Sequence, residues 1–171
     1  MSEKGLHYAF IDSQNLHLAI QGQGWILSYK RFRQYLKDKY KIQKAFMFVG
    51  HLPGNKWLYR FLKNLGYEVI LKPTLLLPNG KVKGNVDTEL VLHAMIEYSN
   101  YDRALIVSND GDFHCLVDYL DGKGKLLKLM IPDSQTYSSL LKKFGPALVF
   151  MNGLRFKLEH KKRGINLRTK P

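Results

Sequence analysis

The sequence has little cysteine and no long apolar run, and each shortage excludes a class of protein. Cys115 is the single cysteine, so no disulfide forms within the chain, which fits a reducing cytoplasm. It lies between Phe113 and Leu116–Val117, and this setting predicts a buried structural thiol. No apolar run reaches the roughly 18 residues of a membrane span, and the first residues do not form a signal peptide. We therefore expect a cytoplasmic protein with no membrane partner.

Acidic residues are also scarce. The chain of 171 residues has 14 Asp and Glu against 27 Lys and Arg, which gives a net charge of +13. Such a balance favours a polyanionic partner, most often nucleic acid, although a basic proteome also yields basic proteins. Residues 155–171 contain seven basic residues and one acid, Glu159. We expect one domain over residues 1–150 and a basic C-terminal tail over residues 151–171.

Apolar runs alternate with helical patterns along the chain. Alternation of this kind implies right-handed crossovers and a parallel sheet, so the sequence predicts an α/β protein with a central, mainly parallel sheet of about five strands. Expected strands are residues 7–11, 44–50, 67–71, 103–107 and 126–131, with 147–150 as a weaker sixth. Expected helices are residues 15–21, 28–39, 55–65, 86–98, 113–120 and 138–144.

Carboxylates follow two of these strands and open one helix. Asp12 ends the first apolar run, Asp110 and Asp112 follow the fourth, and Asp87 begins the helix near residue 86. Ligands of open α/β sheets gather beyond the carboxyl ends of the strands. Several carboxylates there would repel one another unless a cation held them, and Mg²⁺ prefers oxygen ligands. The pattern indicates a metal site.

Each acid also has a simpler explanation. Asp12 could cap the helix that follows it, and Asp110 or Asp112 could cap the next one, because Asp is a favoured N-cap. A cap needs one carboxylate, however, and this turn supplies two. Lys83 lies four residues before Asp87, so the two could form a structural ion pair.

Other candidates carry weaker signals. Glu89 and His93 are four residues apart and could share a metal, although a solvated helix pair is more common. Trp25, Tyr29 and Trp57 lie near basic residues and could stack on bases. No zinc motif and no glycine-rich dinucleotide fingerprint is present.

Three segments in order resemble a known family. They are Phe10–Leu16 (FIDSQNL), Lys83–Asp87 (KGNVD) and Val107–Phe113 (VSNDGDF). Together they closely resemble the NYN-domain family, the LabA-like branch of the PIN-like ribonucleases. Each segment alone is a weak signal, whereas three in order at strand ends are fairly specific. The resemblance covers about residues 6–150.

The resemblance implies a PIN-like three-layer α/β/α sandwich that cleaves RNA with Mg²⁺ or Mn²⁺. It implies that the catalytic and metal-binding residues are Asp12, Asp87, Asp110 and Asp112. For the substrate side it implies that Asn15 orders the first loop, Ser108 steadies the acidic turn and Lys83 contacts phosphate. The expected partner is nucleic acid, RNA ahead of DNA, and a homodimer is left open.

The chain departs from the family pattern at two positions. Many relatives carry a further Asp six residues after the one matching Asp87, where this chain has His93, and a small residue where it has Asn109. A nitrogen ligand or a missing ligand would favour Mn²⁺ or a weaker site. The alternative function is therefore a non-catalytic RNA- or DNA-binding module with a degenerate nuclease site.

Overall fold

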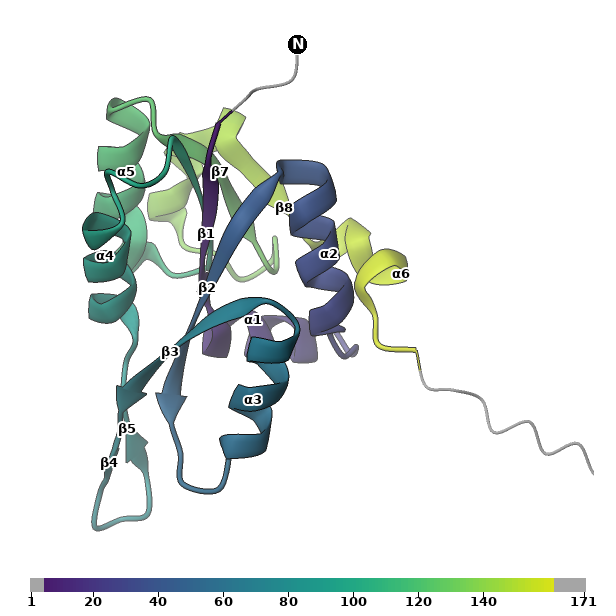
Figure 1. Ribbon diagram of the computed structural model, residues 1–171, viewed down its shortest axis with the longest axis vertical. Coiled ribbons are helices and arrows are strands. Elements are labelled where there is room, and N and C mark those ends of the chain that lie inside the picture. Colours follow the sequence, from purple (N-terminus) through teal and green to yellow (C-terminus); the bar gives the residue numbers. More distant parts are fainter. Residues whose placement is uncertain (1–4, 162–171) are drawn as a thin grey trace, which may run out of the picture.

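The computed structural model describes residues 5–161, and its centre is one parallel sheet of six strands in the order β3-β2-β1-β6-β7-β8 (Figure 1). This confirms the predicted α/β sandwich, with β8 as the sixth strand. The strands are β1 (His7–Asp12), β2 (Ile42–His51), β3 (Tyr67–Pro73), β6 (Arg103–Val107), β7 (Leu126–Ile131) and β8 (Leu148–Phe150). A two-stranded hairpin, β4 (Leu75–Leu76) with β5 (Val82–Lys83), extends beyond the carboxyl end of β3.

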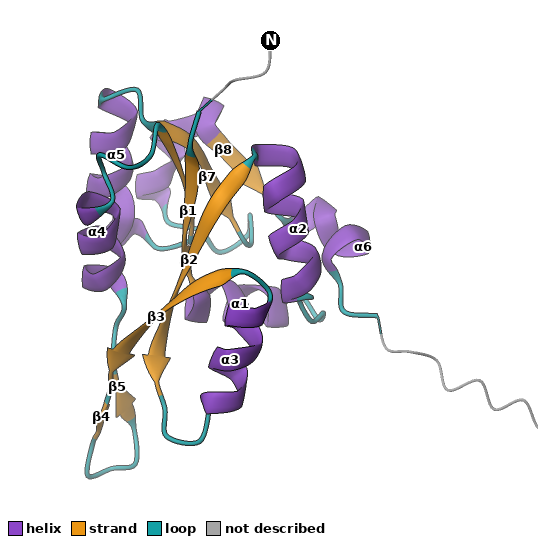
Figure 2. Cartoon of the chain, in the orientation of Figure 1, coloured by secondary structure: helices purple, strands orange, loops and turns teal. Residues whose placement is uncertain are grey.

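Helices cover both faces of the sheet (Figure 2). One face carries α4 (Asp87–Ile96) and α5 (His114–Gly122), and the other carries α1 (Ser13–Gly22), α2 (Tyr29–Tyr40), α3 (Lys56–Asn64) and α6 (Arg155–Leu158). Residues 5–161 also contain three 3₁₀ segments: η1 (Gly111–Phe113), η2 (Ser139–Ala147) and η3 (Asn152–Leu154). Within residues 5–161, no helix is both long enough and apolar enough to cross a membrane.

The sheet is buried on both faces because successive side chains of a strand point to opposite sides. In β1, Tyr8 and Phe10 enter the core under α4 and α5, whereas Ala9 and Ile11 enter the core under α1 and α2. Both faces of the strand therefore need apolar residues, which explains why its sequence is a continuous apolar run rather than an alternating one.

The direction of winding reverses between β1 and β6. From β1 the chain proceeds outward through β2 to β3, and from β6 it proceeds the other way through β7 to β8. At such a switch point the loops after the two central strands diverge and leave a crevice at the carboxyl end of the sheet. Asp12 ends β1, and Asp110 follows β6, so both lie beside this crevice.

Two expectations about single side chains are wrong. Cys115 is exposed, because α5 turns Leu116 and Val117 toward the core and leaves the thiol on its outer side. Trp25 is 4% exposed and belongs to the core beneath α1 and α2, so it does not offer a surface for base stacking.

The first part of the predicted basic tail packs on the domain. Met151 and Leu158 are buried, and the backbone N–H of Ser28 donates to the carbonyl of Leu158 over 2.8 Å. Leu27 and Glu159 form an antiparallel bridge. Residues 162–171 lie outside the described part of the chain, and the boundary between domain and tail stays a prediction.

Candidate active site

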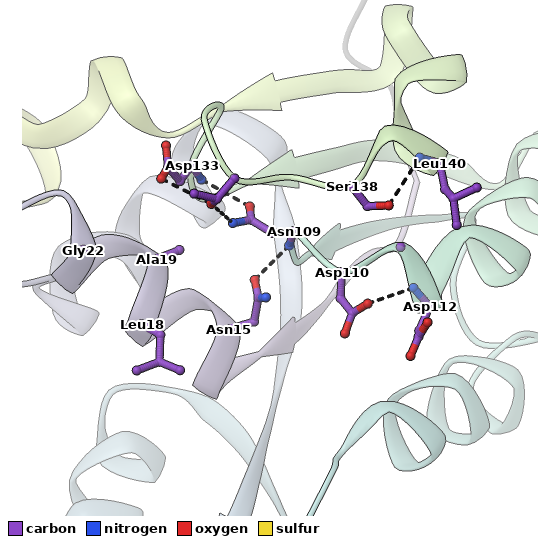
Figure 3. A pocket seen from close by; sticks show the side chains of 12 residues that line it. Asn15, Leu18, Ala19, Gly22, Asn109, Asp110, Asp112, Asp133, Ser138 and Leu140 are labelled. Carbon is purple, nitrogen blue, oxygen red and sulfur yellow. Dashed lines mark hydrogen bonds between the residues drawn. The ribbon is translucent and has the colours of Figure 1, made fainter.

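Three carboxylates meet at the carboxyl end of the sheet. Asp87 begins α4, and Asp110 and Asp112 belong to the turn after β6; each offers an oxygen, and all of these oxygens lie within 4.8 Å of one another. Asp110 shapes the turn, because its Oδ1 accepts from the backbone N–H of Asp112 over 2.9 Å. Figure 3 shows both side chains pointing into the same open space. One cation could contact all three.

Asp12 lies beside this group but does not belong to it. Its side chain is almost buried and lines a cleft of about 240 Å³ together with Asp87 and Asp110. It accepts from the backbone N–H of Asn15 over 3.2 Å and from the hydroxyl of Ser108 over 3.3 Å. The first of these bonds is the N-cap of α1, so Asp12 caps a helix and also faces the acidic cleft.

Burial and neighbouring charges raise the pKa values of Asp12 and Asp87. Burial is the largest cause that raises the pKa of Asp12 to about 6; the charges of Asp87 and Asp110 add to it, and hydrogen bonds from Asn15 and Ser108 oppose it. The pKa of Asp87 is also raised, first by burial and then by Asp110 and Asp112. A bound cation would relieve this repulsion, because opposite charge within a few ångströms favours the ionised form. The residues present therefore fit a divalent metal.

Two predicted substrate residues hold the loops of the site together. The hydroxyl of Ser108 donates to Asp12 and accepts from the backbone N–H of Asp110 over 3.1 Å, which joins β1 to the acidic turn. Asn15 accepts from the backbone N–H of Asn109 over 2.8 Å through its Oδ1 (Figure 3). Ser108 is fully buried, whereas Asn15 lines the clefts on both sides of Asp110.

Among the described residues, Lys83 pairs with none of the carboxylates. It is an exposed residue of β5, and no ion pair joins it to Asp87 in the part of the chain that the structure describes. Asp87 instead accepts from the side-chain amide of Asn85 over 2.6 Å. Lys72 of β3 donates to the carbonyl of Asn85 and pairs with Glu89 at 3.2 Å. The cation that braces this loop is thus Lys72, which the sequence did not single out.

His93 does not join this group of potential metal ligands. Its Nδ1 lies 3.1 Å from the carbonyl of Glu89, and its ring packs edge-on against Phe48 with centroids 5.5 Å apart. Over residues 5–161, Asp87, Asp110 and Asp112 make up the only group of three or more potential ligands so close together.

A polar network that the sequence reading missed supports the other side of the turn. Asn109 donates to Thr136 Oγ1 over 2.9 Å and accepts from the backbone N–H of Asp133 over 3.2 Å. Asp133 accepts in turn from Gln135, Thr136 and Asn152. The signal was present, because Asp133 follows the apolar run of β7 as Asp12 ends that of β1.

The acids lie along a continuous groove. A cleft of about 640 Å³ runs from α1 to η2, and it shares Asn15 and Asp110 with the smaller cleft at Asp12 (Figure 3). Beyond the smaller cleft, a third pocket shares Gln14 and Gly84 with it. The carboxylates therefore lie between two larger hollows.

The NYN domain model matches residues 8–145. The chain belongs to the NYN-domain family. It is 30% identical over 124 residues to the low amplitude and bright protein LabA of Synechococcus elongatus, with 67% of each chain covered. It also resembles the crystal structure of a protein of unknown function from Vibrio parahaemolyticus, with a TM-score of 0.70 and 23% identity over 89% of this chain and 96% of that one. The latter likeness concerns the fold alone. The NYN domain has a PIN-like, nuclease-type fold, and here it carries an acidic cluster.

Proposed function

We propose that this NYN-domain protein is a divalent-metal-dependent ribonuclease that hydrolyses phosphodiester bonds of RNA in the cytoplasm. One observation carries the proposal: carboxylate oxygens of Asp87, Asp110 and Asp112 lie within 4.8 Å of one another. Carboxylates packed so closely repel one another, and Mg²⁺ or Mn²⁺ is the partner whose ligand preference suits them.

The metal would be held by these three residues, with Asp12 at its side. When bound, such an ion polarises a phosphate oxygen and lowers the pKa of a water molecule. The chain contributes the arrangement. Asn85 orients Asp87 through a 2.6 Å hydrogen bond, and Ser108 fixes the turn that bears Asp110. Asp12 lines the same cleft as Asp87 and Asp110, so its carboxylate adds negative charge beside the metal.

RNA fits the charge of the chain. The chain has a net charge of +13, although its acidic site by itself would repel a polyanion. Basic residues elsewhere must therefore supply the attraction, and binding should weaken steeply with salt. Residues 162–171 add four basic residues to the chain and no acid. We propose that they contribute to this attraction.

The test is cleavage of labelled single-stranded RNA with Mg²⁺ or Mn²⁺ and with EDTA. We expect metal-dependent cleavage that Asp110→Asn abolishes and that Asp121→Asn leaves unchanged. Asp121 is the matched control, because it is an exposed Asp of α5 outside the clefts. Protein that binds RNA but never cuts it with either ion would instead be the non-catalytic binding module.

A further inference from the structure

A pocket beside the acidic site has no part in the metal chemistry. It measures about 520 Å³ and lies between α1, α3, β2 and the β4–β5 hairpin. This volume is within the range of about 300–1,000 Å³ that is typical of pockets for small organic groups. It opens toward the acids, because Gln14 and Gly84 line both this pocket and the cleft of Asp12.

The interior of this pocket is apolar. Met47 and Leu62 are almost completely buried, and Leu58 and Tyr29 are half-buried. The hydroxyl of Tyr67 donates to the carbonyl of Tyr29 over 2.7 Å, and the two rings meet edge-on. Tyr29 therefore offers a fixed aromatic surface. Such walls suit a flat, weakly polar ring and do not suit a phosphate.

Polar groups stand at the rim with unused hydrogen-bonding capacity. Asn55 is the N-cap of α3, yet its side chain makes no capping bond. An Asn at this position normally accepts from the first turn of its helix. Within the described residues, the side chains of Gln14, His17 and Asn55 have no hydrogen-bond partner. They can therefore reach a ligand without breaking existing bonds.

We infer that this pocket receives one unpaired nucleobase of a single-stranded RNA whose backbone phosphate lies at the acidic site. The inference deepens the proposed function and rests on it for the choice of ligand. Bases of single-stranded RNA are recognised by aromatic surfaces and by hydrogen bonds to their edges. Gln14 follows Asp12 by two residues, so a base here belongs to a nucleotide adjacent to the phosphate.

A pocket that binds an unpaired base would select among RNA molecules. A base paired within a duplex cannot enter the pocket without being unpaired, at a cost in free energy. The amides of Gln14 and Asn55 each present a donor and an acceptor, so they respond to the edge of the base. We expect a preference for single strands and for particular bases next to the bound phosphate.

The test measures binding without cleavage, so it is independent of the nuclease proposal. Fluorescence anisotropy in EDTA compares labelled poly(A), poly(C) and poly(U) oligonucleotides of equal length with an abasic oligonucleotide of the same charge. We expect the abasic strand to bind least and the best homopolymer to exceed the worst by roughly fivefold or more.

Matched variants locate the effect. Asn55→Ala should reduce the difference between homopolymers to less than about twofold, as should a Gln14→Ala, His17→Ala double variant. Asn64→Ala is the control for Asn55, because Asn64 is an exposed residue at the other end of the same helix. Melting temperature checks that each variant is folded.

Equal affinity of all homopolymers and the abasic strand would overturn the inference, as would base preferences that survive both pocket variants. Base preference that Asn55→Ala removes, in a protein that never cleaves RNA, would support the pocket and refute the nuclease. RNA cleavage by a protein that binds all bases equally would support the nuclease and refute the pocket.

Discussion

Two sets of carboxylates at the same edge of the sheet use their charge in opposite ways. Asp133 follows β7, and its oxygens accept from Gln135, Thr136 and Asn152 at 3.0–3.3 Å. The oxygens of Asp87, Asp110 and Asp112 lie against one another, within 4.8 Å. Donors around Asp133 already satisfy its charge, so it stabilises loops. The other three acids hold a negative potential that a cation would neutralise.

The largest expected effect on activity comes from neutralising one acid of each set, and the two losses should differ greatly. Asp110→Asn should lower RNA cleavage by more than about 100-fold, because even residues that only support metal ligands are worth 10- to 100-fold. Asp133→Asn should lower it by less than about tenfold, since its oxygens face the backbone and Asn152 rather than the acidic group. Initial rates with Mn²⁺ measure both. Equal losses would remove the distinction between the two sets.

The same two variants should change the stability of the protein in opposite directions. Asp133→Asn should reduce the free energy of unfolding by about 1–3 kcal/mol, because an amide group would then face buried donors. Asp110→Asn should raise it slightly without metal, since one of three crowded charges is removed. Urea unfolding in EDTA measures both changes. A loss of stability in Asp110→Asn would mean that the acidic group is structurally satisfied without a cation.

Asp12 sharpens the comparison, because it is hydrogen-bonded and still has a raised pKa. The folded protein holds its proton up to about pH 6, whereas the reference value is 3.8. The folded state therefore binds more protons between these values, and stability falls as the pH rises from about 4 to about 6. At pH 7, the free energy of unfolding of Asp12→Asn should exceed that of the wild type by about 2 kcal/mol. At pH 3.5 the two should be equal.

Thermal unfolding in EDTA across this pH range measures the effect. Asp38→Asn provides the control, because Asp38 is an exposed residue of α2. Parallel stability curves for wild type and Asp12→Asn would show that burial does not hold the proton on this carboxyl group.

Gly111 connects the acidic turn to the loop that follows Asp133. A Cβ atom at this position would lie 2.3 Å from Ser138 Oγ, so a side chain must displace Ser138. Gly111→Ala should cost about 1–2 kcal/mol of stability and shift Asp110 and Asp112 apart. Adding Ser138→Gly should restore part of both losses. A double-mutant cycle on unfolding and on cleavage measures this, and additive losses would contradict the contact.

The smallest effect on activity is expected at His93. His93→Asp introduces the acid that many relatives carry, but the ring packs against Phe48 outside the acidic group. Cleavage should change by less than about threefold, and stability should fall by about 1 kcal/mol as the ring contact is lost. His93→Asn is the uncharged control. A large gain in Mg²⁺-dependent cleavage would show that position 93 reaches the metal.

The sequence predicted the sheet because both of its faces are buried. Each central strand then had to be a continuous apolar run, and such runs are visible at Tyr8–Ile11 and Ala104–Val107. The short outer strand β8 gave a weaker signal, since its residues are only partly buried. The sequence did not predict the hairpin of β4 and β5, because each of its strands has only two residues.

The carboxylates could be found from the sequence, whereas their roles depended on donors that lie far away along the chain. Asp12 and Asp133 both follow apolar strands, and nothing local separates them. Asn152, nineteen positions after Asp133 in the sequence, supplies one of the hydrogen bonds that satisfy it. Similarly, Lys83 is near Asp87 in the sequence, but it is Lys72 of β3 that contacts the segment around Asp87, through Asn85 and Glu89.

The sequence by itself determined the order of strands and helices, the excess of positive charge and the placing of acids at strand ends. Those features are local, because hydrophobic periodicity and charge are properties of neighbouring residues. Only the tertiary structure decided that Asp87 meets Asp110 and Asp112, that Asp133 is satisfied, and that His93 packs away from the acids. Hydrogen bonds and electrostatic repulsion act over a few ångströms, so their outcome depends on which segments the folded chain brings together.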